Sequence, residues 1–544
     1  MNLGDRARGV IVGAAVGDAL GMPLEFGPPR RGAQRNRLRE GNPAQHLTKE
    51  NNPMPYMPDD RPNLLYIHSD QHNPFVTGCY GDPVVQTPNL DRLAARGVLF
   101  ENAYCPSPIC VPSRMSMLTG RHPYENDCWT NDHSLDSGIP TLAHAMGAAG
   151  YWPVLIGRMH SRGPDQLHGY AERLVGDHSA NYIGGTPGVD HGMLTGTQGP
   201  ARISLQLSGI GQNAYEVHDE YTTAAAIYYL NQLGIARRSN VPTEPFSLSI
   251  GFMLPHQPFV ARRKDYERYE GRVPPPDHPE PWGDHLHPYH RWWRERCGIT
   301  DVTDEEVMRC RTAYWALVDR VDAMVGEILE ALERNGLAEN TLIVYSSDHG
   351  EQVGEHGLWW KQTFYEEAVR VPMILCWPGH LPEGLRCNRV VSALDLNATI
   401  LDALGAPALP ASHGRSLLPL IRGETNDWYD IAFSEYCTDE GCIHRMVRRG
   451  DWKLNYYHGQ PPQLFNLRED PTEMHDRAAD PGCQAIREEL TALVLDGWNP
   501  DAVWKRIQEK RADGEILHAW ARRVKPPETY RWPLRPEMDY LEQV

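Results

Sequence analysis

The sequence predicts an α/β fold: a mostly parallel sheet sandwiched by helices, followed by a smaller antiparallel sheet. From residue 61 onward, short apolar runs alternate with stretches of helical periodicity. This alternation is typical of parallel sheets that are covered by helices on both faces. The expected strands of the large sheet are Asn63–Ser69, Pro153–Ile156, Phe246–Phe252, Leu342–Ser347 and Met373–Cys376.

Two helices of this region carry start signals. Thr87 is expected as an N-cap with Pro88 at the first helical position, and Gly97 ends that helix. A longer helix begins at Thr303, because Thr303 and Glu306 have the spacing of a capping box. Apolar residues follow it at three- and four-residue spacing, which predicts one buried face.

The chain divides into three stretches. Residues 1–60 are predicted to be an N-terminal extension that ends in a linker rich in Pro, Arg, Asn and Gly. Residues 61–426 are predicted to form the main domain, and 427–544 a C-terminal subdomain. The elements expected in the last stretch are the strands Ala432–Tyr436, His444–Arg448 and Trp452–Tyr457, and a helix around Cys483–Leu495.

Composition excludes several classes of function. The 544 residues include 53 Lys and Arg against 71 Asp and Glu, a net charge of −18, so nucleic acid is not an expected partner. Apolar runs are too short to span a membrane, and the N-terminus lacks a secretory signal pattern. Eleven scattered cysteines without a CxxC motif predict a reducing, cytoplasmic location.

Polar residues follow four of the expected strands. They are Asp70-Gln71, Asp348-His349, His256 after Pro255, and Arg158-Met159-His160. Ligands of open α/β sheets bind outside the carboxyl ends of the strands, and two carboxylates with an imidazole suit a divalent cation. Each of these residues taken alone is also compatible with a turn or a helix cap.

The segment from Cys110 to Arg121 is the most informative. Pro112 favours a helix that begins near Cys110, where backbone amides and the helix dipole attract an anion. Arg114 lies one turn further on and is able to fork onto a tetrahedral oxyanion. A buried cysteine beside a helix is the plainer interpretation of the same pattern.

Cys110-x-Pro112-Ser113-Arg114, followed by Leu118-Thr-Gly-Arg121, resembles the signature of the formylglycine-dependent sulfatases. Within this alkaline phosphatase-like superfamily, the chain looks most similar to the choline-sulfatase-like and phosphonate monoester hydrolase branches. The resemblance implies an alkaline phosphatase-like fold. It also implies that a formylglycine-generating maturation enzyme oxidises Cys110 to formylglycine, whose hydrate supplies the nucleophile.

The resemblance also implies a metal site. Asp70, Gln71, Cys110, Asp348 and His349 match the ligand positions of the family. Gln71 stands where many sulfatases have a second Asp, and His349 where many have Asn. An all-oxygen site favours Ca²⁺, whereas an imidazole ligand favours Mn²⁺.

Further roles come from the resemblance position by position. Arg114 matches an arginine that contacts the nucleophile and the sulfate, and His160 matches the base that regenerates the aldehyde. His256 and Lys361 match the pair that binds sulfate and protonates the leaving group, while Asn131 matches a substrate-contacting residue. The family usually has Lys-x-His where this chain has Arg158-Met159-His160. Arginine keeps the charge for sulfate binding but is not a proton donor at neutral pH.

The expected function is hydrolysis of the sulfate monoester of a small substrate. Two further possibilities are a phosphonate monoester or phosphodiester hydrolase with the same site, and a non-catalytic protein of sulfatase fold. A choline substrate needs an aromatic and acidic box, for which Trp129, Glu435 and Tyr436 are candidates. Whether the chain forms a homo-oligomer stays open.

Other residues have plainer interpretations. His68 and His72 flank Asp70 and are expected to be structural, and the pair Trp292-Trp293 either walls the substrate cleft or packs under a loop. Glu435, Tyr436 and His444 are weaker candidates for reaching the site. Residues 1–45 resemble the opening of an ADP-ribosylglycohydrolase, too short to hold that catalytic domain, and are expected to have no catalytic role.

Overall fold

The computed structural model describes residues 61–185, 191–241, 243–424 and 426–542. The N-terminal extension predicted over residues 1–60 lies outside the described residues.

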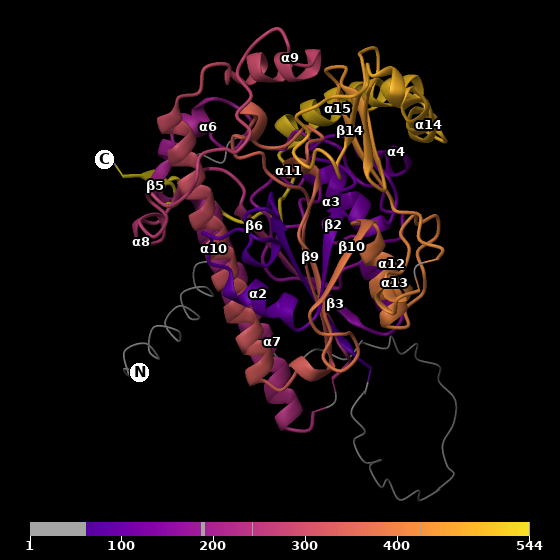
Figure 1. The fold of residues 1–544 in the computed structure, drawn as a ribbon. Coiled ribbons are helices and arrows are strands. Elements are labelled where there is room, and N and C mark those ends of the chain that lie inside the picture. Colours follow the sequence, from indigo (N-terminus) through magenta and orange to yellow (C-terminus); the bar gives the residue numbers. More distant parts are fainter. Residues whose placement is uncertain (1–60, 186–190, 242, 425, 543–544) are drawn as a thin grey trace, which may run out of the picture.

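An eight-stranded sheet forms the centre of the molecule (Figure 1). Its strand order is β10-β2-β9-β8-β1-β6-β3-β4, and among these strands β9 runs antiparallel to its neighbours β2 and β8 while the other pairs are parallel. The prediction of a mostly parallel sheet is confirmed. The bounds are β1 (Asn63–Asp70), β2 (Val98–Tyr104), β3 (Trp152–Gly157), β4 (Glu172–Arg173), β6 (Phe246–Pro255), β8 (Thr341–Ser347), β9 (Met373–Cys376) and β10 (Leu385–Ser392).

The five strands expected from apolar runs are all present, whereas β2, the two-residue β4 and β10 were missed. β10 is an edge strand whose first five residues alternate between half-buried and exposed, so its sequence has no continuous apolar run. β2 contains Glu101 and Asn102 in its middle, which interrupts the run in the same way. Burial on both faces leaves a strong sequence signal, and an edge position does not.

Helices cover both faces of the sheet, and successive residues of β1 show this directly (Figure 1). Leu65 and Ile67 belong to a core with α7 and α10, while Leu64 and Tyr66 belong to a second core with α5 and α12. The longer helices of this domain are α2 (Pro88–Ala95), α3 (Cys110–Thr119), α5 (Leu142–Ala148), α7 (Ala214–Arg238), α9 (Pro288–Cys297), α10 (Asp304–Arg334) and α12 (Asp395–Ala403). The shorter ones are α4 (Pro123–Asn126), α6 (Ile203–Gln206), α8 (Arg263–Tyr266), α11 (Glu366–Val369) and α13 (Leu418–Ile421), with 3₁₀ turns at Gly78–Tyr80, Gly192–Leu194, Ala338–Asn340 and Glu355–Gly357.

The two helix start signals have different outcomes. At α10 the capping box forms, because the Glu306 amide donates to the Thr303 hydroxyl and the Glu306 carboxylate accepts from the Thr303 amide at 2.9 Å. Thr87 stands at the N-cap of α2, but its hydroxyl does not cap the helix. It accepts from the Gly78 amide at 2.8 Å and donates to Asp91 at 3.0 Å. A competing loop contact therefore takes the hydroxyl away from its expected role.

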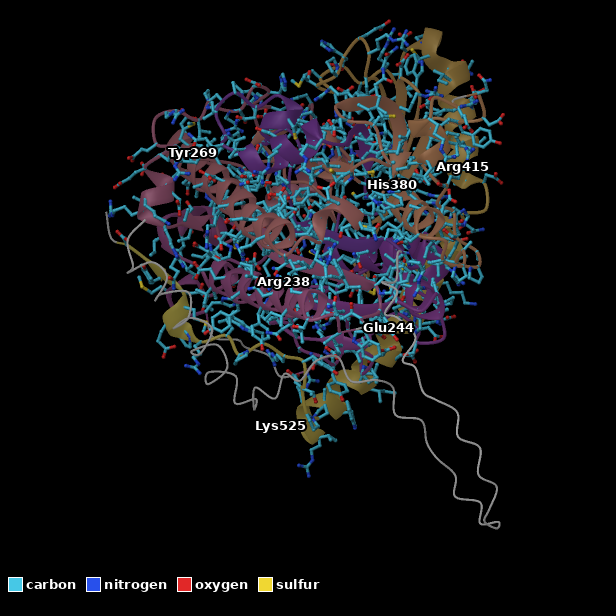
Figure 2. The ribbon with its side chains drawn as sticks, turned by 90° about the horizontal axis from the view of Figure 1, so that it is seen from below. Arg238, Glu244, Tyr269, His380, Arg415 and Lys525 are labelled. Atoms are coloured by element: carbon cyan, nitrogen blue, oxygen red, sulfur yellow. The ribbon has the colours of Figure 1, made fainter. Side chains whose placement is uncertain are left out.

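A separate antiparallel sheet follows, with its own core and two helices. Its strands are β11 (Ile431–Cys437), β12 (Ile443–Arg449), β13 (Trp452–Tyr457) and β14 (Gln463–Asn466). The predicted C-terminal sheet is present. Helices α14 (Gln484–Leu495) and α15 (Pro500–Val524) pack on it, and Lys525 lies at the tip of α15, which stands out from the body of the molecule in Figure 2. Beyond α15, a 3₁₀ turn (Pro536–Met538) leads to β15 (Tyr540–Leu541), which joins β5 (Gly209–Gln212) and β7 (Val260–Ala261) in a third sheet, and another 3₁₀ turn (Pro481–Cys483) precedes α14.

A buried ion cluster joins the large sheet's domain to the C-terminal sheet. Lys453 on β13 contacts carboxylate oxygens of Glu366 and Glu473, each at 2.8 Å, and its side chain is fully buried. The same Glu366 also accepts from the Tyr104 hydroxyl at 2.7 Å and from Arg448 at 3.2 Å. Removal of this cation would leave buried carboxylates without a partner, which is strongly destabilising.

Two findings bear on the surroundings of the protein. Every helix in the described ranges is too short or too polar to cross a membrane. All eleven cysteines lie in the described part of the chain, and each one is a free thiol.

Candidate active site

The polar residues that follow the strands meet at one edge of the large sheet. Asp70 ends β1, Asp348 follows β8, and Arg158 follows β3, while His256 follows β6. Because β1 is parallel to β6 and β8, and β3 is parallel to β6, these ends lie side by side. The juxtaposition that the sequence predicted is therefore present.

Four of the five expected metal ligands form a compact buried cluster. One ligand atom each from Asp70, Cys110, Asp348 and His349 lies within 4.8 Å of all the others. His349 Nε2 lies 3.3 Å from Cys110 Sγ and 3.5 Å from Asp348 Oδ2. Two carboxylates and a neutral imidazole, whose pKa burial lowers to about 4, suit a divalent cation.

The fifth expected ligand, Gln71, lies beside the cluster, because its backbone amide donates to Asp348 Oδ1 at 3.0 Å. Its backbone has a φ of 65°, a left-handed conformation that is uncommon outside glycine. Its Oε1 accepts from Lys361 Nζ at 2.5 Å, and this ammonium lies 3.3 Å from Cys110 Sγ. Gln71 Nε2 points away, toward Gln257 and Glu351.

Cys110 is the first residue of α3, as predicted, and Ile109 is the N-cap. Burial and Asp70 oppose ionisation of the thiol. The Lys361 ammonium and a hydrogen bond with His256 outweigh them, and the pKa of Cys110 lies below its usual value. The side chain at position 110 is therefore in a site that stabilises negative charge on its terminal atom.

Arg114 is fully buried and its guanidinium bridges the two carboxylates of the cluster. Nε donates to Asp348 Oδ2 and Nη2 to Asp70 Oδ2, both at 2.9 Å, while Nη1 lies 3.2 Å from His68 Nδ1. Burial disfavours the charged form of Asp70, but Arg158 and Arg114 hold the pKa of Asp70 well below its usual range. Arg114 thus keeps both carboxylates ionised. His68 contacts the guanidinium on its remaining nitrogen, Nη1.

Arg158 joins Asp70 to a residue that the sequence analysis missed, Asp177. Nε donates to Asp70 Oδ2 at 2.5 Å, Nη1 to Asp177 Oδ1 at 3.2 Å, and Nη2 lies 3.0 Å from His160 Nδ1. Asp177 also accepts from the His160 amide at 3.1 Å. Burial and the Arg158 charge place the pKa of His160 well below its usual value, so its imidazole is neutral. No motif marks Asp177, which lies 19 residues from Arg158.

Lys361 and His256 lie against Cys110 from two other segments. Burial and the Lys361 ammonium lower the pKa of His256. The lysine is flanked by Trp360 (φ 67°) and Gln362 (φ 74°), both left-handed. Strained backbone of this kind persists only where surrounding contacts hold it, and it clusters at functional sites.

The remaining candidate residues lie in different places. Asn131 is beside the centre, because its Oδ1 accepts from the amide of Val111 at 3.0 Å. Trp129 and Glu435 are buried and bonded to each other, Nε1 to Oε1 at 2.7 Å. The other residues pack elsewhere: His72 against the Tyr345 hydroxyl (2.7 Å), Trp293 in the core, and Trp292, Tyr436 and His444 around Tyr289.

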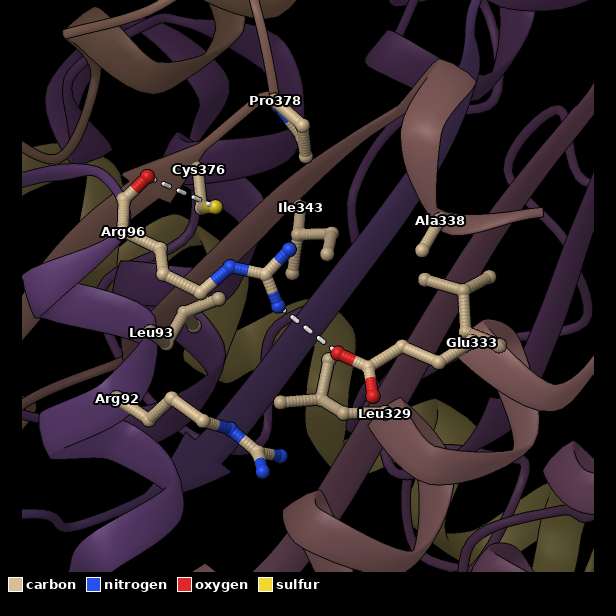
Figure 3. Close-up of a pocket in the computed structure, with 10 residues that line it drawn as sticks. Arg92, Leu93, Arg96, Leu329, Glu333, Ala338, Ile343, Cys376 and Pro378 are labelled. Atoms are coloured by element: carbon tan, nitrogen blue, oxygen red, sulfur yellow. Dashed lines mark hydrogen bonds and ion pairs between the residues drawn. The ribbon is translucent and has the colours of Figure 1, made fainter. Parts of the chain in front are cut away.

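Two pockets differ in what they are able to hold. The pocket of Figure 3 lies between α2, α10 and β9, has a volume of about 10 Å³, and is spanned by the Arg96–Glu333 ion pair at 2.9 Å. It has room for about one water molecule. A cavity of about 450 Å³ borders Asn131. Most of the residues that line it are polar or charged, and they come from the loop Thr130–His133, Asp439 and α15 residues from Lys510 to Arg522, together with Ile183.

Comparison with known proteins identifies the family. The sulfatase family model matches residues 62–406, and the C-terminal model of N-sulphoglucosamine sulphohydrolase matches residues 354–497. The ADP-ribosylglycohydrolase model matches residues 1–75, in agreement with the resemblance noted there. The chain belongs to the sulfatase family, which comprises hydrolases that act on sulfuric esters.

Individual relatives agree with this assignment. The choline-sulfatase of Rhizobium meliloti (strain 1021) is 33% identical over 492 residues, covering 85% of this chain and 92% of the relative. Arylsulfatase K of Gallus gallus is 28% identical, covering 78% and 80%. Among solved structures, the phosphonate monoester hydrolase of Agrobacterium radiobacter has a TM-score of 0.66 at 25% identity, covering 80% and 95%. A 2-O GAG sulfatase has a TM-score of 0.65 at 25% identity, covering 83% and 94%. The alkaline phosphatase-like fold is thereby confirmed.

Proposed function

We propose that this protein hydrolyses sulfate monoesters with a nucleophile made from Cys110. One observation carries the proposal: the side chain at position 110 stands at a helix N-terminus against two carboxylates, an imidazole and a buried ammonium. This is a place where an oxygen nucleophile and an anionic ester group are both stabilised.

The divalent ion would be held by Asp70, Gln71, Asp348, His349 and the side chain at position 110, and it would supply Lewis-acid stabilisation of the ester oxygens. Formylglycine at position 110 would supply the attacking oxygen. Arg114 keeps the two carboxylates ionised and in place, since its guanidinium bonds to both. The ion is Mn²⁺ or Ca²⁺, and the imidazole ligand favours Mn²⁺.

Proton transfer is assigned to the residues around position 110. Lys361 lies 3.3 Å from Cys110 Sγ, and His256 bonds to the same atom, so both are placed to hold the ester and to protonate the leaving oxygen. His160 is neutral and is assigned as the base that restores the aldehyde. Arg158, where the family usually has lysine, is assigned to orient Asp70 and His160 and to leave proton transfer to the others.

A phosphonate monoester or phosphodiester is the second candidate substrate. One observation favours it: the similarity to a phosphonate monoester hydrolase at a TM-score of 0.66. Parallel assays on 4-nitrophenyl sulfate and a phenyl phosphonate monoester, each with Mn²⁺ and with Ca²⁺, separate the two substrate classes. A higher kcat/KM for the phosphonate would replace the sulfatase proposal.

The alcohol part of the substrate has two candidate locations. Trp129 and Glu435 bond to each other and are buried, which leaves little of a cation-binding box open to solvent. The polar cavity of about 450 Å³ beside Asn131 is large enough for a hydrated alcohol of sugar size. We therefore assign the alcohol to this cavity. Choline sulfate and a monosaccharide sulfate are the test pair, and preference for choline sulfate would reverse the assignment.

Mass spectrometry of the tryptic peptide that contains Cys110 tests the nucleophile. Protein from a host that contains the maturation enzyme should carry an aldehyde there, and Cys110→Ala should abolish turnover with an unchanged fold. An unmodified thiol in folded, metal-loaded protein that cleaves no ester would instead support a non-catalytic protein of sulfatase fold.

The free thiols support a proposed cytoplasmic location. We also propose domain limits at residues 60 and 426.

A further inference from the structure

The amide of Gln71 lies between two kinds of hydrogen-bonding group. On its oxygen side is the Lys361 ammonium, at 2.5 Å. On its nitrogen side are Gln257 Oε1, at 2.6 Å, and the Glu351 carboxylate. Gln71, Gln257 and Glu351 have no exposed surface, and Lys361 is 3% exposed. These side chains are therefore shielded from bulk solvent.

These neighbours determine which way the amide points. An ammonium only donates hydrogen bonds. The Glu351 carboxylate is an acceptor here, because its Oε1 accepts from two backbone amides and its Oε2 from Gln71 Nε2. A flipped Gln71 would set its NH₂ group against Lys361 and its oxygen against two acceptors. Gln257 has the same constraint, because its own Nε2 donates to the Gln198 carbonyl at 3.2 Å, so its oxygen must face Gln71.

Glu351 is held in turn by the loop that carries Lys361. Its Oε1 accepts from the amide of Trp360 at 2.6 Å and from that of Val353 at 3.1 Å, which leaves Oε2 for Gln71. Trp360 is the left-handed residue just before Lys361. One carboxylate thus fixes both the amide of Gln71 and the loop that brings the ammonium to it.

We propose that Glu351 is a positioning residue that aims the Gln71 amide oxygen at the metal site, and that its carboxylate is the reason why glutamine stands at position 71. An acidic residue at that position would present a carboxylate to the carboxylate of Glu351. This inference rests on the proposed metal site, in which Gln71 is a ligand.

The test measures Mn²⁺ and Ca²⁺ binding to the metal-free, full-length protein by isothermal titration calorimetry, with no substrate present. In Glu351→Gln, the NH₂ group of the new glutamine must face either Gln71 Nε2 or the backbone amides of Val353 and Trp360, and both are donors. We therefore expect this variant to bind Mn²⁺ and Ca²⁺ at least 10-fold more weakly than the wild type. In Gln71→Glu/Glu351→Gln, the new amide donates to the new carboxylate. We expect this double variant to bind Mn²⁺ at least 5-fold more tightly than Glu351→Gln.

Glu355→Gln is the matched control. Glu355 lies on the same loop and is also buried, but its carboxylate bonds to Arg311 (3.1 Å) and to the amides of Asp277 and His278. It should lower the unfolding temperature and leave metal affinity within twofold of the wild type. Circular dichroism and thermal unfolding of each variant check folding.

Three results overturn the inference. If the metal affinity of Glu351→Gln is within twofold of that of the wild type, Glu351 has no positioning role. If Glu355→Gln weakens metal binding as much as Glu351→Gln does, the effect comes from loop stability. If Gln71→Glu changes affinity by the same factor in both backgrounds, the two residues are not coupled. These results leave the proposed metal site standing, whereas wild-type protein that binds neither ion refutes that site and this inference together.

Discussion

Replacing Arg158 by lysine tests whether the several nitrogens of the guanidinium, and not only its charge, are needed to hold the neighbouring side chains in place. The guanidinium makes three contacts: with Asp70 at 2.5 Å, with Asp177 at 3.2 Å and with His160 at 3.0 Å. A lysine has one nitrogen at the end of a flexible stem and is able to keep about one of these contacts. Asp70 and Asp177 are both buried, so at least one carboxylate loses a partner without gaining water.

The expected loss follows from these contacts. A hydrogen bond to a charged group contributes about 1.5–3 kcal/mol, and the retained charge and backbone amides offset part of the loss, so Arg158→Lys should destabilise the protein by about 2–4 kcal/mol. An unfolding entropy of about 2.1 cal/mol/K per residue then predicts a fall of about 2–4 °C in Tm for a chain of this size. Asp177→Asn should cost less in the Arg158→Lys background than in the wild type, because its partner is already gone.

Differential scanning calorimetry at neutral pH measures the effect. Arg386→Lys is the control, since that guanidinium is half exposed and pairs with Glu101 at 2.8 Å, and its replacement should change Tm by less than about 1 °C. If Arg158→Lys shifts Tm no more than Arg386→Lys does, the contacts of Arg158 with Asp70 and Asp177 do not stabilise the fold, and the role of Arg158 in orienting the site is refuted.

Three further changes have defined outcomes. Asp348→Asn should reduce the bound metal measured by mass spectrometry after dialysis, and wild-type metal content would remove Asp348 from the ligand set. Lys453→Met should destabilise by about 3–5 kcal/mol in urea unfolding, because two buried carboxylates lose their cation; a change below about 1 kcal/mol would contradict this. Burial raises the pKa of Glu367 from 4.5 to about 8, so the folded state holds a proton that the unfolded chain has released. This contribution therefore lowers stability as pH rises from 4.5 to about 8, by up to about 1.4 kcal/mol per pH unit. Glu367→Gln should flatten that fall in chemical unfolding at several pH values, and parallel curves for variant and wild type would refute the reasoning.

The sequence predicted the features that depend on neighbouring residues. β1 and β8 each contain a short apolar run, and the capping box at Thr303 needs only two residues three positions apart. The position of Cys110 at the start of α3 follows from Pro112 and the residues after it. The strand-end residues were expected to meet because parallel strands end at a common edge.

Local patterns failed where a distant partner decided the outcome. Thr87 has the identity of an N-cap, but the Gly78 amide takes its hydroxyl. β10 lacks an apolar run because it lies at the edge of the sheet. The contact between Trp129 and Glu435 spans 306 residues of chain, and no local pattern indicates it.

The sequence by itself determined which side chains are able to bind a metal ion or transfer a proton, and which strand ends carry them. The tertiary structure alone decided how those groups are oriented, through Asp177 behind Arg158 and Glu351 behind Gln71, which is 280 residues away. The physical reason is that strand and helix patterns are set by contacts a few residues apart. The direction of a buried amide or guanidinium is set instead by whichever donors and acceptors the fold brings against it, and no local pattern records those.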